Sequence, residues 1–273
     1  SLGDLNLLPS GLDWSAGLED MWTPGEDGAQ QALEEFLDSR ITTYSTDREV
    51  PSVVGTSLLS PYLRWGEISP YQVWHAATLA QREHPETSQG VQCFLKELVW
   101  REFSWNILYH FPDLATRNWR SDFDRFPWPE LDADSLHAWQ TGNTGVPLVD
   151  AGMRELWRNG WMHNRVRMIA ASFLTKNLLI DWRLGEQWFW DTLVDADAAN
   201  NPFNWQWAAG SGADAAPYFR IFNPEIQAKK FDSEELYIRA NIQEWGTSDY
   251  PEPIVDLKTT RAEALAAYHA LQQ

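Results

Sequence analysis

WMHNRVRMIAASFLTKNLLIDW, residues 161–182, is the stretch that decides the fold. Its apolar residues recur at intervals of three and four, which is typical of an amphipathic or buried helix. The same spacing marks QQALEEFLDSRI at 30–41 and VQCFLKELVWREFSWNILYHF at 91–111. No sustained alternation of apolar and polar residues predicts a substantial sheet. We therefore expect an all-α fold, with one helical domain over residues 29–273.

The segments between the predicted helices differ in character. Residues 1–28 mix Gly, Pro, Trp and acids without a sustained period, so we expect an irregular lead-in or linker there. Gly-, Pro- and Asn-rich connectors follow at 51–61, 141–147 and 199–219. The last connector, ANNPFNWQWAAGSGADAAPYF, is long for a helical domain, which favours a functional loop.

The composition is unusual in two respects, because the 273 residues include 17 tryptophans and carry a formal net charge of -18. Such acidity argues against tight, non-specific binding of nucleic acid. The acids gather at the ends, with nine acids and one base in residues 1–40 and eight acids and three bases in residues 231–273. Residues 150–183 hold six bases and three acids, which favours a small basic footprint there.

Several classes of protein find no support in the sequence. The single Cys93 excludes an internal disulfide, and no CxxC or Cys/His cluster offers a zinc or iron–sulfur site. No run approaches the ~18 apolar residues of a membrane span, and SLGDLNLLPSG at the start lacks the features of a signal peptide. No GxSxG or HExxH motif suggests a hydrolase or a zincin. We expect a reducing, cytoplasmic setting, with no metal and no membrane contact.

One face of the helix predicted over 96–109 combines polar and aromatic residues. At about 100° per residue, Leu98 points away from this face. One interpretation is a solvated Glu97–Arg101 pair at i,i+4 beside a half-buried Trp. The other is the floor of a site with an acid, an aromatic plate and a phosphate-sized cation. The residues on the face are Glu97, Trp100, Arg101 and Ser104.

A second stripe lies on the helix of WMHNRVRM, where Arg165 points sideways. A stripe of Trp and Met usually belongs to a core, but a buried amide and guanidinium need polar partners. Asp195 or Asp197 is a candidate partner for the guanidinium through a bidentate ion pair, although the two acids could instead bind a metal. GTSLLSP at 55–61 suits either a phosphate cradle or a helix N-cap. The residues of the stripe are Trp161, Asn164, Arg167 and Met168.

Six ordered blocks together resemble the flavin-binding domain of DNA photolyases and cryptochromes. The resemblance implies the all-α photolyase/cryptochrome FAD-binding fold, most similar to the class I enzymes that repair cyclobutane pyrimidine dimers. The segment at 250–271 is similar to the family's closing segment, and the family's N-terminal α/β antenna domain has no counterpart here, so no antenna chromophore is expected. The blocks are YSTDREVPSVVGTSLLSPYLRWGEIS (44–69), ELVWREF (97–103), TGNTGVPLVDAGMREL (141–156), GWMHNRVRMIAASFLTKNLLIDW (160–182), LVDADAANNPFNWQW (193–207) and DAAPYFRIFNP (214–224).

The resemblance implies FAD as cofactor and assigns its contacts. The residues implied at the phosphates and ribitol are Tyr44, Thr56, Ser57, Leu58, Leu59 and Ser60, with Phe94 and Arg101 nearby. Those implied around the isoalloxazine are Asn164, Arg167, Asp195, Asp197 and Asn201. Plant cryptochromes carry Asp where this chain has Asn201, and an amide cannot supply the proton that a carboxylic acid can. Asn201 therefore favours the repair branch.

The resemblance also gives part of the tryptophan excess a role. It implies an electron-transfer chain from Trp205 beside the flavin through Trp182 to Trp128 at the surface, with Trp119 close to the last position. Indoles are readily oxidised, so several short hops carry charge faster than one long step. The remaining tryptophans are expected to serve packing.

The implied partner is UV-damaged DNA with a pyrimidine dimer flipped out of the duplex. The residues implied at the lesion are Glu97, Trp100, Asn164, Met168 and Trp207, and those implied at DNA phosphates are Arg48, Arg101, Arg165 and Arg220. The implied activity is a carbon–carbon lyase reaction driven by light through excited reduced FAD. A cryptochrome-like photoreceptor and an FAD-binding fragment without activity of its own are the alternatives. The family resemblance suggests a monomer.

Overall fold

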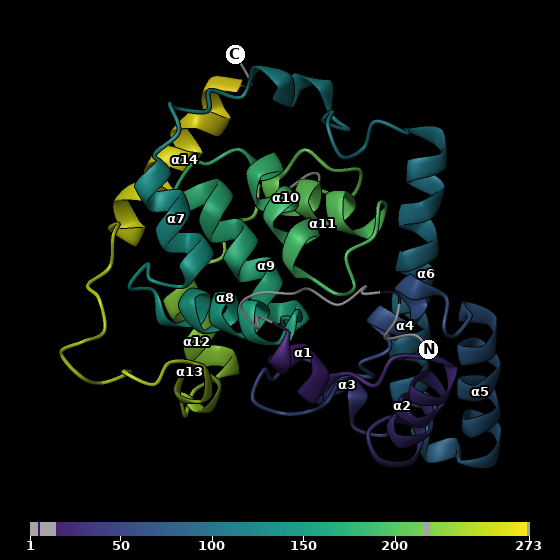
Figure 1. The fold of residues 1–273 in the computed structure, drawn as a ribbon. Coiled ribbons are helices and arrows are strands. Elements are labelled where there is room, and N and C mark those ends of the chain that lie inside the picture. The colour runs from purple at the N-terminus through teal and green to yellow at the C-terminus, as the bar shows by residue number, and fades with distance from the viewer. Residues whose placement is uncertain (1–4, 6–14, 216–218, 272–273) are drawn as a thin grey trace.

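The computed structural model describes residues 5, 15–215 and 219–271, and within these ranges the regular structure is helical (Figure 1). This confirms the all-α prediction. Short 3-10 helices lie at η2 (Pro85–Thr87) and η3 (Ser121–Arg125), and a π-helical turn at η4 (Phe173–Asn177). The α-helices are α1 (Ala16–Met21), α2 (Glu26–Ser39), α3 (Tyr44–Asp47), α4 (Ser60–Trp65), α5 (Pro70–Glu83), α6 (Ser88–His110), α7 (Ala133–Thr141), α8 (Pro147–Asn159), α9 (Asn164–Ser172), α10 (Trp182–Thr192), α11 (Asn200–Ala209), α12 (Pro224–Phe231), α13 (Leu236–Asn241) and α14 (Leu257–Leu271).

The helices form two groups, each around its own apolar core. The first core is built by residues 29–98, with Phe36, Tyr44 and Phe94 in mutual ring contact at centroid distances of 4.7–5.6 Å. The second is built by residues 139–242 and contains the buried Trp139 and Trp182. In Figure 1, α2, α4, α5 and α6 lie on the right and α7, α8, α12 and α13 on the left, with α10 and α11 between them.

The stretch 161–182 is not the continuous helix that its periodicity suggests. His163 caps α9 by accepting a hydrogen bond from the Arg165 backbone N–H at 3.2 Å, so the helix begins at residue 164. The helix widens into the π-turn η4 and ends before Leu179, whose φ of 50° is left-handed. Asp181 then caps α10 through the Arg183 N–H at 3.0 Å. Two local caps therefore divide one apolar pattern into two helices.

Two segments predicted as irregular contain helices. Residues 200–209, placed in a long loop by their Asn and Pro content, form α11. Pro202 falls in the first turn of this helix, where a proline disrupts no intrahelical hydrogen bond. Within residues 1–28, 16–21 form α1 and α2 begins at Glu26, whereas residues 1–4 and 6–14 lie outside the described residues.

A buried lysine fixes the end of α11. The side chain of Lys176, on η4, is fully buried, and its ammonium donates a hydrogen bond to the Ala209 carbonyl and lies 3.7 Å from the ring centroid of Phe219. A cation is favourable at a helix C-terminus, where the carbonyls are unpaired. Burial lowers the pKa of Lys176 well below its ordinary value. This contact holds α11 against η4.

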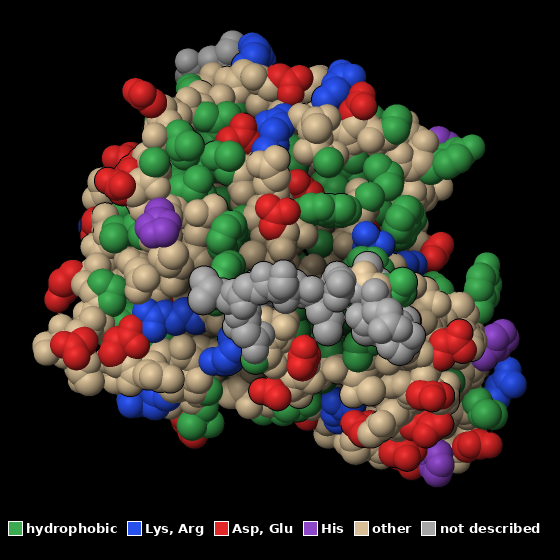
Figure 2. Space-filling view, in the orientation of Figure 1, with side chains coloured by type: hydrophobic (Ala, Val, Ile, Leu, Met, Phe, Trp, Pro, Cys, Tyr) green, Lys and Arg blue, Asp and Glu red, His purple; other side chains and the backbone are tan. Residues whose placement is uncertain are grey.

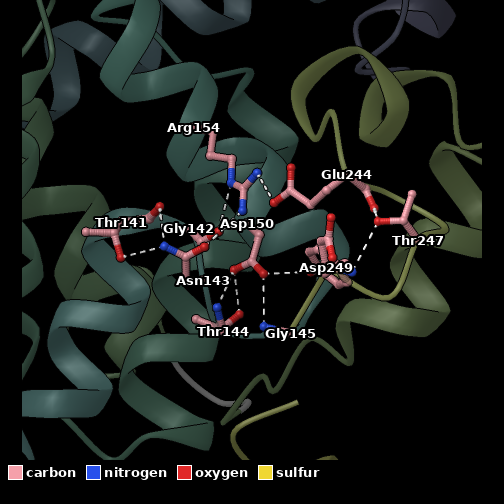
Figure 3. A network of polar contacts seen from close by, with 11 residues as sticks. Thr141, Gly142, Asn143, Thr144, Gly145, Asp150, Arg154, Glu244, Thr247 and Asp249 are labelled. Carbon is pink, nitrogen blue, oxygen red and sulfur yellow. Dashed lines mark hydrogen bonds and ion pairs between the residues drawn. The ribbon is translucent and has the colours of Figure 1, made fainter. Parts of the chain in front are cut away.

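A buried carboxylate organises the loop before α8. Asp150 accepts hydrogen bonds from the backbone N–H and the hydroxyl of Thr144, at 2.9 and 2.6 Å, and from the Gly145 N–H at 2.9 Å (Figure 3). The Tyr250 hydroxyl donates a fourth bond at 2.6 Å. Beside it, Arg154 pairs with Glu244 at 2.6 Å. The network joins α8 to the segment that follows α13.

Candidate functional site

A cavity of about 310 Å³ lies between the two helix groups. Three helices each present one face to it, with lining residues three or four positions apart, as a single helix face requires. Residues 56–60 and 193–197 close its sides. The residues from the three faces are Phe94, Glu97, Leu98 and Arg101 of α6; Asn164, Arg167, Met168 and Ala171 of α9; and Asn201, Asn204, Trp205 and Ala208 of α11, with Asn200 and Trp207 of α11 also in the lining.

The lining face of α6 is rotated from the predicted one. Leu98, expected to point away, is buried and lines the cavity, whereas Trp100 is 46% exposed and lies outside the lining. The predicted face was centred near Trp100, whereas the lining includes the apolar Phe94 and Leu98, so the observed face lies closer to Leu98. The predicted Glu97–Arg101 pair is also replaced, because each side chain has another partner.

One ion pair spans the cavity wall. The Arg167 guanidinium donates two hydrogen bonds to Asp195, at 3.0 and 2.9 Å, and a third to the Met162 carbonyl at 2.6 Å. The Ser60 hydroxyl donates to the same carboxylate at 2.6 Å. Asp197 has a different role, because it accepts backbone N–H bonds at the start of α11. Asp195 is therefore the partner of Arg167.

Asn201 is oriented by a glutamate. Its Nδ2 donates to the Glu186 carbonyl and to the Glu186 carboxylate, both at 2.9 Å. Because both amide hydrogens are taken, the carbonyl oxygen of Asn201 is the part of the amide that can accept a hydrogen bond from a ligand. Burial raises the pKa of Glu186, and the bond from Asn201 lowers it to a smaller extent.

The cations predicted at DNA phosphates are already near acids or aromatic rings. Arg48 donates to Glu97 at 2.5 Å, and Arg165 forms an ion pair with Glu49. The guanidinium of Arg101 donates to the Leu63 carbonyl at 3.2 Å and lies 3.6 Å from Glu102. Arg220 lies 5.1 Å from the centroid of the Trp207 ring. Three of these four arginines therefore already lie beside an acid.

His163 lies beside these cations as a neutral group. Burial, then the nearby Arg167 and Arg48, lower the pKa of His163 to about 4. Its Nδ1 accepts the Arg165 N–H, as an N-cap residue does. At neutral pH the imidazole adds no charge to the cavity and holds the first turn of α9, which carries Asn164.

The predicted electron-transfer tryptophans occupy three environments. Trp205 is 2% exposed and lines the cavity. A Cβ added to Gly185 would lie 2.2 Å from the Trp205 ring, so this ring packs on α10 one turn from Trp182. Trp182 is 1% exposed and shares the core with Trp205. Trp128 is partly buried and packs against the same core.

Most of the predicted site residues converge on this cavity. Those outside its lining are Trp100, Trp128, Arg165, Trp182 and Arg220. Those in its lining are Tyr44, Arg48, Thr56, Ser57, Leu58, Leu59, Ser60, Phe94, Glu97, Arg101, Asn164, Arg167, Met168, Asp195, Asp197, Asn201, Trp205 and Trp207. Among the described residues there is no group of three or more His, Cys, Asp or Glu side chains that could hold a metal. None of the described helices is long and apolar enough to cross a membrane.

Comparison with known proteins matches this geometry to one family. A family model described as the FAD binding domain of DNA photolyase matches residues 94–247. The chain belongs to this family. A deoxyribodipyrimidine photo-lyase of Agrobacterium fabrum is 48% identical over 100% of this chain and 61% of the relative, and that of Escherichia coli is 44% identical over 91% and 56%. The chain thus spans about 60% of the length of these photolyase relatives.

Solved structures of the family have the same fold. A bacterial class III photolyase from Agrobacterium tumefaciens aligns with a TM-score of 0.94 at 49% identity, covering 100% of this chain and 61% of that one. A Synechocystis cryptochrome aligns with a TM-score of 0.84 at 29% identity, covering 96% and 59%. Photolyases and cryptochromes therefore share this helical domain, and placement of the chain in class I stays a prediction.

Three residues at the site were missed by the sequence analysis: Glu49, His163 and Glu186. Glu49 and His163 lie inside the quoted blocks, but their spacing places neither on a predicted stripe. Glu186 lies in LGEQWFW (184–190), outside the quoted blocks. A buried Asn needs a partner, and that requirement was the one available signal for Glu186.

Proposed function

We propose that this chain binds FAD in the cavity and repairs cyclobutane pyrimidine dimers in DNA under light. The observation that carries the proposal is the convergence of the thirteen flavin-contact residues implied by the sequence on one cavity, in a member of the photolyase FAD-binding family. Deoxyribodipyrimidine photo-lyases from several bacteria are 40–48% identical to this chain.

The residues of the cavity fit an FAD molecule. The hydroxyls of Thr56, Ser57 and Ser60, with Arg101, would meet the phosphates and ribitol, because phosphates require donors and positive charge. Arg167 and Asp195 would border the polar edge of the isoalloxazine, offering donors and acceptors respectively.

The flavin would supply the light absorption and the electron that splits the dimer. Around it, the protein positions the partners and excludes water. The carbonyl oxygen of Asn201, held by Glu186, can accept a hydrogen bond from a ring N–H of a reduced flavin but cannot donate a proton. Because Trp205 and Ala171 are buried at the cavity wall, they keep water away from the bound ring.

The lesion would enter between α6 and α11. Glu97 would meet the polar edge of the bases by hydrogen bonding, while Met168 and Trp207 offer them apolar surface. Flipping the dimer costs a few kcal/mol, less for a poorly stacked lesion, and these contacts offset it. Exposed acids gather on α2, in the lower right of Figure 2, rather than in the lining of this cavity.

The test is direct. The FAD-loaded, reduced protein is mixed with an oligonucleotide that contains one thymine dimer, illuminated with blue light, and assayed for loss of the dimer. We expect loss only in the light and only with reduced flavin. Bound flavin without light-dependent loss would instead favour a photoreceptor or an inactive fragment, and failure to bind FAD would reject the whole assignment.

Glu97→Ala is expected to lower the repair yield about tenfold or more while FAD stays bound, because a desolvated hydrogen bond to the lesion is worth about 1.5–3 kcal/mol. The measurement is dimer loss per absorbed photon, with FAD occupancy read from its absorbance. Glu83→Ala is the control, since Glu83 is an exposed acid on α5 outside the cavity lining. Equal losses in the two variants would contradict a lesion contact for Glu97.

Trp182→Phe is expected to slow the light-driven reduction of oxidised FAD strongly, because phenylalanine is far harder to oxidise than tryptophan. Repair by protein reduced chemically beforehand should change little, since the electron then starts on the flavin. Flavin absorbance under steady illumination follows the first process and dimer loss the second. Trp157→Phe, at an exposed position, is the control. Parallel loss of both activities would speak against a hopping role for Trp182.

A further inference from the structure

The indole N–H of Trp182 donates its hydrogen bond to a side-chain amide and not to a carboxylate or another basic group. Trp182 Nε1 donates to Asn118 Oδ1 at 3.0 Å, and Asn118 Nδ2 donates onward to Asp124 Oδ1 at 2.7 Å. Asn118 is 6% exposed, while Asp124 lies at the surface on η3. The structure thus places a buried amide between the buried indole and an exposed carboxylate.

We propose that Asn118 is a positioning residue that keeps Trp182 protonated while it is oxidised, so that the charge moves on to the surface instead of being trapped. The inference rests on the proposed function, in which Trp205 loses an electron to the light-excited oxidised flavin. Trp182 lies in the same core as Trp205, one turn of α10 from the contact between Gly185 and Trp205.

The chemistry follows from the acidity of an oxidised indole. A neutral tryptophan holds its Nε1 proton firmly, whereas its radical cation is an acid that gives the proton to any nearby carboxylate or water. The neutral radical that remains is a weaker oxidant than the radical cation. A base at Nε1 would therefore stop the charge at Trp182, and an amide carbonyl is far too weak a base to do so.

Among the described residues, the hydrogen bond of the Trp182 indole N–H goes to Asn118 and not to a carboxylate. The indole ring is buried, and the charged group over it is Arg183, 4.7 Å from the centroid and paired with Asp181 at 3.0 Å. The amide of Asn118 accepts at oxygen and donates at nitrogen, so it cannot pass a proton to Asp124 without changing its tautomer. Asp124 fixes the orientation of Asn118 but stays one group away from the indole.

The steps balance as electron transfer alone. Trp205, as a radical cation, takes one electron from Trp182 and returns to its neutral form. Trp182 becomes the radical cation with its N–H bond intact, and then takes one electron from a more exposed aromatic residue. The proposed donors are Trp119, which directly follows Asn118 and is 37% exposed, and Trp128, which is partly buried against the same core. A proton leaves only at that outer residue, into water.

The decisive variant exchanges the two partners, Asn118→Asp with Asp124→Asn. It keeps the net charge, the two side-chain types and the hydrogen bond between them, but puts the carboxylate against Trp182. Asp124→Asn alone is the control, because it leaves the amide in place. In the FAD-loaded protein, transient absorption after a light pulse distinguishes the tryptophan radical cation from the neutral radical.

We expect the wild type and Asp124→Asn to show the radical cation first, formed at equal rates in H2O and D2O. The exchanged variant should lose that signal early to the neutral radical, with a slower rise in D2O. The same protonation state in the exchanged variant and the wild type would overturn the inference. Absence of any tryptophan radical in the flavin-loaded wild type would overturn the proposed electron path as well, so the two failures are distinguishable.

A second measurement does not depend on the exchanged variant folding. With Trp119→Phe and Trp128→Phe combined, neither of the two proposed outer donors can reduce Trp182. We expect a radical cation that decays by recombination, without a neutral radical at any stage. Formation of the neutral radical in this variant would show that Trp182 finds a base despite Asn118, and the inference would be wrong.

Discussion

Asp150→Asn is expected to lower the free energy of unfolding by about 3–5 kcal/mol, the range for breaking a buried, fully bonded charge. The carboxylate accepts four hydrogen bonds from Thr144, Gly145 and Tyr250. An amide of the same size can accept at one oxygen only, and its NH2 group would face donors that already point at it. The loop before α8 would then lose its anchor to the segment after α13.

Urea unfolding of the FAD-free chain, followed by tryptophan fluorescence, measures this cost. Asp134→Asn removes the same charge at an exposed helix position and should shift stability by less than about 0.5 kcal/mol. Tyr250→Phe deletes one of the four bonds and should cost about 1–2 kcal/mol. If Asp150→Asn were no more harmful than Asp134→Asn, the buried network would not stabilise the fold.

The pH dependence of the free energy of unfolding is a second test of the role of Asp150. Burial raises the pKa of Asp150, and its hydrogen bonds lower it to a smaller extent. A carboxyl group whose pKa is higher in the folded state binds its proton more tightly there. Its contribution to stability is full below the unfolded pKa and is lost as the pH rises through the folded pKa. Between these two pKa values, the free energy of unfolding of the wild type minus that of Asp150→Asn should therefore decline as the pH rises.

The residues that line the cavity were predicted from the sequence more accurately than the boundaries of the helices that carry them. Helical periodicity places side chains at known angles, so the stripe of Asn164, Arg167 and Met168 on one face of α9 follows from spacing alone. Helix boundaries depend instead on single capping contacts such as those of His163 and Asp181. Such contacts appear only once the chain is folded, and the break at 178–181 contains neither Gly nor Pro to mark it.

Pairs of interacting side chains that are far apart in the sequence were harder to predict. Arg167 needed an acid, and two candidates in VDADAANN could not be separated by chemistry. Geometry decides between them, because Asp197 is used by the backbone at the start of α11 and Asp195 is left free for the guanidinium. Glu186 reaches Asn201 from another helix, which no local pattern encodes. Family resemblance located the residues, and the structure supplied their connections.

Arg167→Met is expected to weaken FAD binding by about 30-fold or more. Asp195, whose side chain is 6% exposed, would keep only the Ser60 hydroxyl as a side-chain partner, and an uncompensated buried carboxylate costs about 2–5 kcal/mol. Arg167→Lys should recover little, because an ammonium cannot make the two parallel bonds to Asp195 together with the bond to the Met162 carbonyl.

Titration of the flavin-free protein with FAD, followed by quenching of flavin fluorescence, gives the dissociation constant. Arg239→Met removes an exposed i,i+4 pair with Glu235 and should leave that constant unchanged.

The double variant Arg167→Met with Asp195→Asn separates two causes of weaker FAD binding. If the loss came only from the stranded carboxylate, neutralising it would restore most of the affinity; if the guanidinium itself meets the flavin, the double variant would stay weak. Because Arg167 lines the cavity as well as holding Asp195, we expect restoration to be partial. Full affinity in Arg167→Met alone would remove this ion pair from the proposed flavin site.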